Sequence, residues 1–270
     1  MISLEKMHTN ESKQQNQPQT PGRGQRPMKE ATTNAVWFDW DRTLVRVVGD
    51  VAGHERLAAL FQREGLRFTP AQMAAAIARY RADVAQQKLP FLGDPPQGQQ
   101  DIMTYYAHLL HNLGFKRVDK ALLERLYSGY ALLPTILYGD ALPVLAALQA
   151  RGIALGIISN HSITVRPVME RMVGEFVAPE HIVISQELGV TKPSPYIFAE
   201  AIERMAISAA HSFYVGDNLE VDAVGAVQHG GFARGFWLDR SRVSMAAGEK
   251  RPFPHQVTRI TNLWQILDWL

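Results

Sequence analysis

Five short, almost uninterrupted apolar segments restrict the fold of this chain more than any other feature. They occupy residues 35–38, 153–158, 182–184, 213–215 and 236–238. Strands buried on both faces of a parallel sheet have such sequences, whereas a strand with one wet face alternates polar and apolar residues. Segments with helical periodicity lie between them, at residues 141–150, 165–176, 196–205 and 221–228. This alternation predicts an α/β fold, a Rossmann-like doubly wound parallel sheet with helices on both faces.

One long stretch departs from the alternation. Between about residues 51 and 133 only helical patterns occur, over residues 55–64, 71–87, 101–113 and 120–131. We therefore predict an inserted α-helical cap domain at residues 49–134 and a catalytic core formed by residues 35–48 and 135–270. Residues 1–34 are rich in Gln, Pro, Thr, Asn and Lys, a composition typical of a disordered tail. Residues 262–270 have the pattern of an amphipathic helix that packs on the core.

The overall composition excludes several classes of protein. The chain has 28 basic and 26 acidic residues, too small an excess to indicate nucleic-acid binding. No apolar stretch approaches the roughly 18 residues that a membrane span requires, and the N-terminus lacks the apolar segment of a secretory signal. The absence of cysteine excludes disulfides and thiolate chemistry. We expect a cytoplasmic protein with no nucleic-acid or membrane partner; the sequence leaves its oligomeric state open.

Acidic residues directly follow the first apolar segment, in the sequence Asp39-Trp40-Asp41-Arg42-Thr43. On a continuing strand the two carboxylates would point to opposite faces. If the strand ends at residue 38 and the chain turns, both carboxylates can converge beyond the edge of the sheet. Such a concentration of negative charge is unfavourable without a positive partner, so the pattern indicates a divalent cation and chemistry on an anionic group.

Three further polar segments follow or lie near later strands. They contain Ser159 and Asn160, then Lys192 before a proline-opened helix, then Asp217 and Asp222. Because ligands of such folds bind beyond the carboxyl ends of the strands, we expect these side chains to meet. Oxygen ligands without a histidine or thiolate set fit Mg²⁺ and a phosphate group better than Zn²⁺.

Together these groups can perform phosphoryl transfer. Asp39 is a candidate nucleophile, Asp41 a candidate acid and base, and Lys192 a cation that offsets the repulsion between two anions. Each segment taken alone can also be explained by a purely structural role, as a solvated turn, a helix cap or a partner of a helix dipole. His161 is a further candidate for substrate contact, with a packing role as its structural alternative.

The four segments, in this order, resemble the haloacid dehalogenase-like hydrolase superfamily, in particular its helical-capped, phosphoglycolate phosphatase-like branch. The resemblance covers about residues 36–238. It implies that Asp39 is the nucleophile and a metal ligand. It also implies that Asp41 is the acid/base and binds the metal through its backbone carbonyl. Arg42 stands where many members have glycine, and Asp41 separates the chain from the dehalogenases, which lack a second aspartate.

The same resemblance assigns roles to the later residues and to Thr43. Thr43 would support the turn at the phosphate site. Ser159 and Asn160 would hold phosphoryl oxygens, and Lys192 would bridge the nucleophile and the phosphate. The remaining metal ligands would be Asp217 and Asp222, the latter directly or through water.

The resulting expectation is a Mg²⁺-dependent phosphatase that acts on a small phosphorylated metabolite through an aspartyl-phosphate intermediate. Two alternatives remain open: a phosphomutase on the same scaffold, and a non-catalytic binding or regulatory module. Four carboxylates and a lysine held together without catalysis would be electrostatically costly, which disfavours the module. The identity of the substrate cannot be read from the predicted cap.

Overall fold

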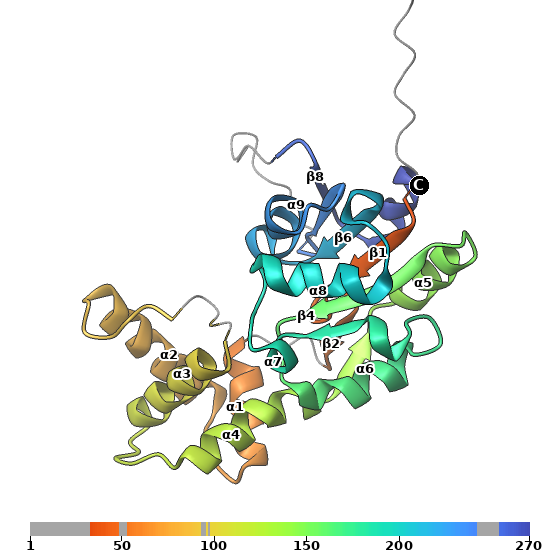
Figure 1. Cartoon of the computed structure of the whole chain (residues 1–270). Helices are drawn as coiled ribbons and strands as arrows, with labels where there is room; N and C mark the ends of the chain where they lie inside the picture. Colours follow the sequence, from red (N-terminus) through yellow and green to blue (C-terminus); the bar gives the residue numbers. More distant parts are fainter. Residues whose placement is uncertain (1–32, 49–52, 93–95, 97, 242–253) are drawn as a thin grey trace, which may run out of the picture. The chain divides into compact units, whose positions relative to one another are not determined.

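A six-stranded parallel sheet forms the centre of the structure; the five apolar segments predict five of its strands, and β8 is an addition. The strand order is β5-β4-β1-β6-β7-β8, and every neighbouring pair is parallel. The bounds are β1 Ala35–Phe38, β4 Ala154–Ser159, β5 Ile182–Ile184, β6 Ser212–Gly216, β7 Arg234–Leu238 and β8 Val257–Ile260. Figure 1 shows β1 between β4 and β6, with β8 further along the sheet.

The computed structural model describes residues 33–48, 53–92, 96, 98–241 and 254–270. All of them belong to one compact unit, Ala31–Leu270. The tail predicted for residues 1–34 lies outside the described residues except for its last two. The residue limits predicted for tail, core and cap remain predictions.

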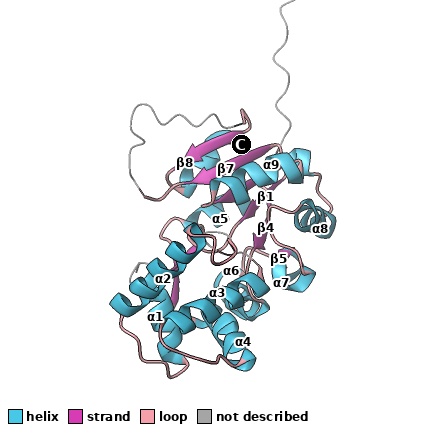
Figure 2. Ribbon diagram, turned by 90° about the vertical axis from the view of Figure 1, so that its left-hand side faces the viewer, coloured by secondary structure: helices cyan, strands magenta, loops and turns pink. Residues whose placement is uncertain are grey.

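Side chains of β1 alternate between two separate apolar layers. Val36 and Phe38 belong to a cluster that includes side chains of α5 (Ala141–Gln149), α6 (Arg166–Val173) and the C-terminal helix η6 (Leu263–Trp269). Ala35 and Trp37 belong to the opposite cluster, with α8 (Pro195–Met205) and α9 (Gly225–Gly230). Figure 2 shows helices on both sides of the strands. The sheet is therefore doubly wound, and its strands are apolar because both faces are covered.

The absence of a side chain at Gly156 leaves space for the large ring of Trp37. The two residues are register partners on β4 and β1. A Cβ atom at position 156 would lie 2.3 Å from the Trp37 ring, closer than atoms can approach. The glycine within the apolar segment 153–158 thus makes room for a fully buried tryptophan, whose burial contributes on the order of 2–3 kcal/mol.

Four helices lie between the short strands β2 (Val45–Val47) and β3 (Thr135–Leu137), which pair antiparallel. They are α1 Gly53–Arg63, α2 Pro70–Ala85, α3 Gln99–Asn112 and α4 Lys120–Gly129, followed by the short helix η1 Tyr130–Leu132. We call α1 to η1 the cap helices. They share an apolar cluster of their own, built around Phe61, Met73 and Leu109. The sequence predicts these helices but not the two three-residue strands, which are too short to show a pattern.

Local sequence signals explain several helix starts. Thr69 caps α2 through a reciprocal capping box with Gln72, and Pro70 occupies the first turn. Ser194 caps α8 in the same position before Pro195. Asp119 caps α4 by accepting a hydrogen bond from the backbone of Ala121.

Two predicted helices differ in detail from the structure. Residues 221–228 are divided between a π-helix, η5 (Leu219–Val224), and α9. Asn218 begins this irregular segment because its side chain accepts hydrogen bonds from two successive backbone amides. The C-terminal segment, predicted as an amphipathic helix, is the 3₁₀-helix η6, and Leu263 and Ile266 are buried against the core as expected.

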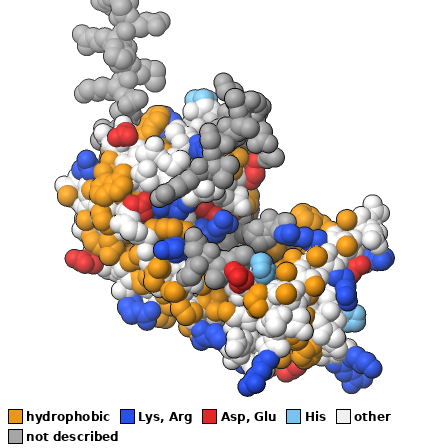
Figure 3. All heavy atoms as spheres, turned by 180° about the vertical axis from the view of Figure 1, so that it is seen from behind, with side chains coloured by type: hydrophobic (Ala, Val, Ile, Leu, Met, Phe, Trp, Pro, Cys, Tyr) orange, Lys and Arg blue, Asp and Glu red, His pale blue; other side chains and the backbone are white. Residues whose placement is uncertain are grey.

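The remaining short helices connect the main elements. They are η2 Ile163–Val165, η3 Pro179–His181, α7 Ser185–Leu188 and η4 Ala209–His211. Within the described residues, no helix has the length and apolarity needed to cross a bilayer. On the face shown in Figure 3, basic and acidic side chains are mixed with apolar ones. The predicted cytoplasmic location remains a prediction.

Candidate active site

The predicted site segments converge at one edge of the sheet. Asp39 directly follows β1, Ser159 is the last residue of β4, and Asp217 directly follows β6. Because β4, β1 and β6 are parallel neighbours, these three chain positions lie side by side. They line a common cavity with Lys192 and Asp222. The structure therefore brings together the residues that the sequence places at strand ends.

A tight turn after β1 brings Asp39 and Asp41 into this cavity. The backbone amide of Asp39 still donates to Val215 of β6, at 2.8 Å. The chain then turns, and the carbonyl oxygen of Trp40 accepts bonds from the amides of residues 44 and 45. Arg42 has φ +60°, a left-handed conformation that glycine adopts more easily. This conformation explains why glycine suits the position, and the Arg42 guanidinium pairs with Asp217 at 3.4 Å.

Lys192 is the centre of the hydrogen-bond network. Its side chain is 2% exposed, and Nζ lies 2.7 Å from both Asp39 Oδ1 and Asp222 Oδ1. Nζ also donates to the hydroxyl of Tyr214 at 2.9 Å, so all three ammonium protons have partners. Burial opposes the positive charge, but Asp222 and Asp39 outweigh it and raise the pKa of Lys192 well above its ordinary value. The lysine is therefore charged and fixed in place.

Tyr214 is a site residue that the sequence analysis missed. It lies in the middle of β6, within a segment that reads simply as a buried strand. Its hydroxyl accepts from Lys192 and donates to the carbonyl of Ile158 on β4, at 2.9 Å. Only the strand order reveals this contact, because 56 residues separate Tyr214 from Ile158.

Asp222 is drawn against the end of β6 by the absence of a side chain at Gly216. A Cβ atom at Gly216 would lie 2.3 Å from Asp222 Cγ. Asp222 Oδ2 accepts from the backbone amide of Asn218 at 3.0 Å, and Oδ1 accepts from Lys192. Burial raises the pKa of Asp222 to about 6, with Lys192 counteracting and Asp39 adding to this shift.

The ion-pair partner of Asp217 is Arg42, whose side chain is 67% exposed. Burial, followed by the charges of Asp39 and Asp222, raises the pKa of Asp217 to about 8. Burial also raises the pKa of Asp39, although Lys192 counteracts the shift. An oxygen atom from each of these three carboxylates lies within 4.8 Å of the others. Three close carboxylates against the buried Lys192 and the exposed Arg42 still leave an excess of negative charge.

This excess fits a divalent cation. Mg²⁺ prefers hard oxygen ligands and commonly takes only a few carboxylates with water and phosphate oxygens completing the shell. The donor set of Asp39, Asp217 and Asp222 is of this kind. No histidine or sulfur ligand belongs to the cluster, which disfavours a zinc site. The residues present therefore fit the predicted magnesium ion.

Two of the predicted phosphate-binding side chains make contacts within the site. Thr43 is fully buried, and its hydroxyl donates to Asp39 Oδ2 at 3.4 Å. Asn160 holds the backbone of Lys192: its amide nitrogen donates to the Lys192 carbonyl at 3.0 Å, and its oxygen accepts from the Lys192 amide at 2.7 Å. Ser159 is buried at the cavity wall. Phosphate binding by these residues stays a prediction.

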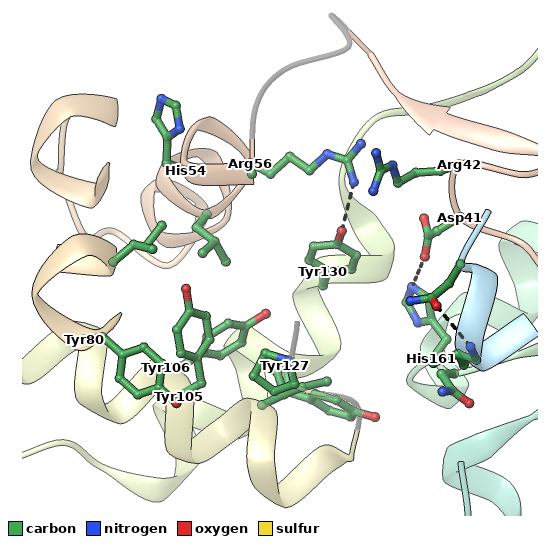
Figure 4. Close-up of a pocket in the computed structure, with 18 of the residues that line it drawn as sticks. Asp41, Arg42, His54, Arg56, Tyr80, Tyr105, Tyr106, Tyr127, Tyr130 and His161 are labelled. Atoms are coloured by element: carbon green, nitrogen blue, oxygen red, sulfur yellow. Dashed lines mark hydrogen bonds and ion pairs between the residues drawn. The ribbon is translucent and has the colours of Figure 1, made fainter. Parts of the chain in front are cut away.

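A second network surrounds Asp41. His161 is buried, its Nε2 lies 3.5 Å from Asp41 Oδ2, and its Nδ1 lies 3.3 Å from the carbonyl of Ser162. Burial lowers the pKa of His161, while Asp41 counteracts the shift. The imidazole ring also lies 5.8 Å from the ring of Tyr130, whose hydroxyl accepts from Arg56 at 3.1 Å. Figure 4 shows this series of side chains from α1 and η1 to Asp41.

The cavity that contains these groups has a volume of about 910 Å³. Asp39, Asp41, Lys192 and Asp217 lie on its sheet side, and residues of α1, α2, α3 and α4 form the other wall. Hydrogen bonds connect the two sides. The Thr164 hydroxyl donates to the carbonyl of Ser128 at 2.9 Å, and the side-chain amide of Gln186 donates to the side-chain oxygen of Gln99 at 2.8 Å. A ligand can thus contact the aspartates and the cap helices at the same time.

Comparison with known proteins gives a consistent result. The model of the haloacid dehalogenase-like hydrolase family matches residues 33–230. A zebrafish (Danio rerio) protein, haloacid dehalogenase-like hydrolase domain-containing protein 3, is 29% identical over 76% of this chain and 85% of its own length. A glyceraldehyde 3-phosphate phosphatase of Methanopyrus kandleri is 36% identical, but over only 34% of this chain and 40% of that protein.

Solved structures agree with the fold. The HAD-hydrolase YfnB from Bacillus subtilis, bound to magnesium, has a TM-score of 0.65 and 20% identity, over 88% of this chain and 99% of that one. A protein described as a predicted phosphoglycolate phosphatase, from Haemophilus somnus, has a TM-score of 0.61 and 16% identity, over 90% and 99% of the two chains. At sequence identities of 20% and 16%, these two structures show a similar fold and nothing about activity. The match of the family model over most of the chain shows that this protein belongs to the haloacid dehalogenase-like hydrolases.

Proposed function

We propose that this hydrolase is a Mg²⁺-dependent phosphatase that cleaves a small phosphorylated metabolite through an aspartyl-phosphate on Asp39. The observation that carries the proposal is the buried Lys192 ammonium, 2.7 Å from both Asp39 and Asp222 at the base of the cavity. Relatives named as phosphatases support the reaction class; one is a ribulose-1,5-bisphosphate 5-phosphatase of Halopiger xanaduensis, 27% identical over 71% of this chain and 80% of its own length.

Asp39 is suited to attack phosphorus. Lys192 binds one of its carboxylate oxygens and Thr43 the other, which fixes the orientation of the group. An oxygen of Asp39 forms the new bond to phosphorus while the bond to the ester oxygen breaks. Attack of one anion on another is repulsive, and a fixed ammonium in a buried site reduces that repulsion more effectively than water does.

Asp41 is suited to move the protons. It lines the same cavity, and its side chain is 32% exposed, so it can reach substrate. As an acid it gives a proton to the departing ester oxygen. As a base it then takes a proton from the water that attacks the phosphorylated Asp39, and inorganic phosphate is released.

The metal would be held by Asp39, Asp217 and the backbone carbonyl of Asp41, with Asp222 binding directly or through water. When bound, Mg²⁺ would neutralise negative charge on the phosphate oxygens. Ser159, at the end of β4, is proposed to hold a phosphoryl oxygen. Asn160 contributes by holding the backbone of Lys192 in place.

The proposal is tested by measuring inorganic phosphate released from a panel of phosphate esters with Mg²⁺ present. Asp39→Asn keeps the shape of the side chain and removes the nucleophile, so we expect at least about a thousandfold loss of kcat. Asp268→Asn changes an exposed aspartate of η6 and serves as the matched control, with unchanged kcat. Wild-type turnover by Asp39→Asn would refute the covalent mechanism, and absence of phosphate release by the wild-type protein would refute the phosphatase proposal.

A further inference from the structure

The cap side of the cavity has an unusual composition. Five tyrosines from four elements line it, together with aliphatic side chains of α1, α2 and α3; the tyrosines are Tyr80, Tyr105, Tyr106, Tyr127 and Tyr130. Tyrosine combines a flat apolar face with a polar hydroxyl at one end. Tyr105 and Tyr130 are half-buried and offer planar apolar surfaces with a hydroxyl at the rim, whereas Tyr80, Tyr106 and Tyr127 are buried.

Three of the tyrosine rings are grouped together. The Tyr80 and Tyr105 rings have centroids 5.0 Å apart and an angle of 70° between their planes, and the Tyr105 and Tyr106 rings lie 6.1 Å apart. Figure 4 shows these rings on the cap side, away from Asp41. Aromatic rings prefer such tilted and edge-to-face neighbours, so a further flat ring fits beside them better than a flexible polar chain.

The residue types absent from this wall are equally informative. Among the described cap residues that line the cavity there is no Asn, Gln, Ser, Thr, Asp or Glu. These are the side chains that commonly bind sugar hydroxyls in pairs, and a buried hydroxyl without a partner costs about 1–3 kcal/mol. Apart from tyrosine hydroxyls, the polar groups of the described wall are His54, Arg56 and Arg81. A polyol leaving group would therefore be poorly satisfied here.

The size of the cavity points in the same direction. Its volume of about 910 Å³ is near the upper end of the range for pockets that hold drug-sized ligands, roughly 300–1,000 Å³. A triose phosphate would leave most of this space unfilled. Asp39 lies on the sheet side of the cavity, and the tyrosines line the cap side, where the ester's organic group would enter.

From these observations we propose that the substrate is a phosphate monoester whose organic group carries a planar aromatic or heteroaromatic ring system, held by the tyrosines of the cap helices. This inference rests on the proposed phosphatase function and specifies its substrate class.

The test compares three synthetic esters of primary alcohols, so that the acidity of the leaving group is similar: naphthylethyl phosphate, octyl phosphate and glycerol phosphate. We expect kcat/KM for naphthylethyl phosphate to exceed both others by at least about tenfold, since one well-packed aromatic contact set supplies a factor of this size. Comparable values for octyl phosphate would show that the wall selects only for apolarity and would overturn the proposal. A preference for glycerol phosphate would overturn it while leaving the phosphatase function intact.

Substitutions locate the effect on the cap side. Tyr105→Leu keeps an apolar side chain but removes the half-buried ring, so KM for naphthylethyl phosphate should rise about five- to tenfold and KM for octyl phosphate much less. Tyr196→Leu, at a 75% exposed position on α8, is the matched control and should change neither value. An unchanged ratio of the two KM values in Tyr105→Leu would overturn the proposal. Hydrolysis of other phosphate esters but of none of these three would overturn it as well, whereas absence of phosphate release from every ester tested would refute the phosphatase function itself.

Discussion

The ammonium nitrogen of Lys192 lies 2.7 Å from Asp39 Oδ1, although 153 residues separate the two in the sequence. The contact joins the end of β1 to the loop before α8, and Asp222 receives a second bond of the same length from the same nitrogen. Removing the lysine therefore leaves two buried carboxylates without their common partner.

Lys192→Met tests the energetic importance of this network. In metal-free protein we expect the free energy of unfolding to fall by about 3–5 kcal/mol, because a buried ion network loses its cation. Urea unfolding at neutral pH measures the change. Lys120→Met, at an 80% exposed side chain of α4, should lie within about 0.5 kcal/mol of wild type. Equal stability of the two variants would contradict the central role assigned to Lys192.

Gly216→Ala tests the close approach of Asp222 to the end of β6. The new methyl group would overlap Asp222 Cγ, so the carboxylate must move and we expect Mg²⁺ affinity to weaken about tenfold or more. Isothermal titration with Mg²⁺ measures the affinity. Gly139→Ala provides the control, because a Cβ at position 139 meets nothing within 4 Å. An unchanged affinity in Gly216→Ala would show that Asp222 does not contribute to the metal site.

The raised carboxyl pKa values predict how stability depends on pH. Asp217 titrates at about 8 and Asp222 at about 6 in the metal-free fold, against an ordinary value of 3.8. Between the ordinary value and these raised pKa values the folded state retains protons that the unfolded state has lost, so the contribution of these two carboxyl groups to the free energy of unfolding falls as the pH rises from about 4 to 8. Mg²⁺ requires the ionised carboxylates, and its stabilising effect should therefore grow over the same interval.

Thermal unfolding with and without Mg²⁺ at pH 5.5 and pH 8 measures this effect. We expect Mg²⁺ to raise Tm more at pH 8 than at pH 5.5. Asp217→Asn should make the Mg²⁺-induced increases at the two pH values more nearly equal. A shift in Tm that does not change with pH would contradict the assignment of these carboxylates to the metal.

His161→Gln tests whether the imidazole orients Asp41. We expect kcat to fall about ten- to a hundredfold with a smaller change in KM, because Asp41 acts on the reacting oxygen after substrate has bound. Steady-state kinetics on one ester separates the two constants. His229→Gln, at an exposed position of α9, is expected to leave both unchanged. If KM rises and kcat is preserved, His161 binds substrate instead of positioning Asp41.

The sequence was sufficient to predict most of the sheet and the meeting of the three site segments that directly follow its strands. The reason is geometric: strands of a parallel sheet end at a common edge, so polar residues after β1, β4 and β6 must lie near one another. The bounds of β1 and β5 agree with the apolar segments at residues 35–38 and 182–184. Buried strands of this kind have a strong signal because both faces select for apolar residues.

Other features depend on tertiary contacts that leave no local signal. Tyr214 reads as one more apolar residue of a strand, and its link to Lys192 follows only from the placement of β6 beside β1. Arg56 and Tyr130 form a hydrogen bond across 74 residues, between the first cap helix and the end of the last. The strand β8, with the sequence Val-Thr-Arg-Ile, is too short and too polar to be distinguished from a loop.

The most direct test of the account is the detection of a phosphoryl group on Asp39 during turnover. Protein mixed with substrate and Mg²⁺ is quenched in acid within milliseconds, digested, and analysed by mass spectrometry. We predict a phosphorylated peptide that contains Asp39, absent from Asp39→Asn. Rapid phosphate release without any such peptide, or the same peptide mass in Asp39→Asn, would contradict nucleophilic attack by this carboxylate.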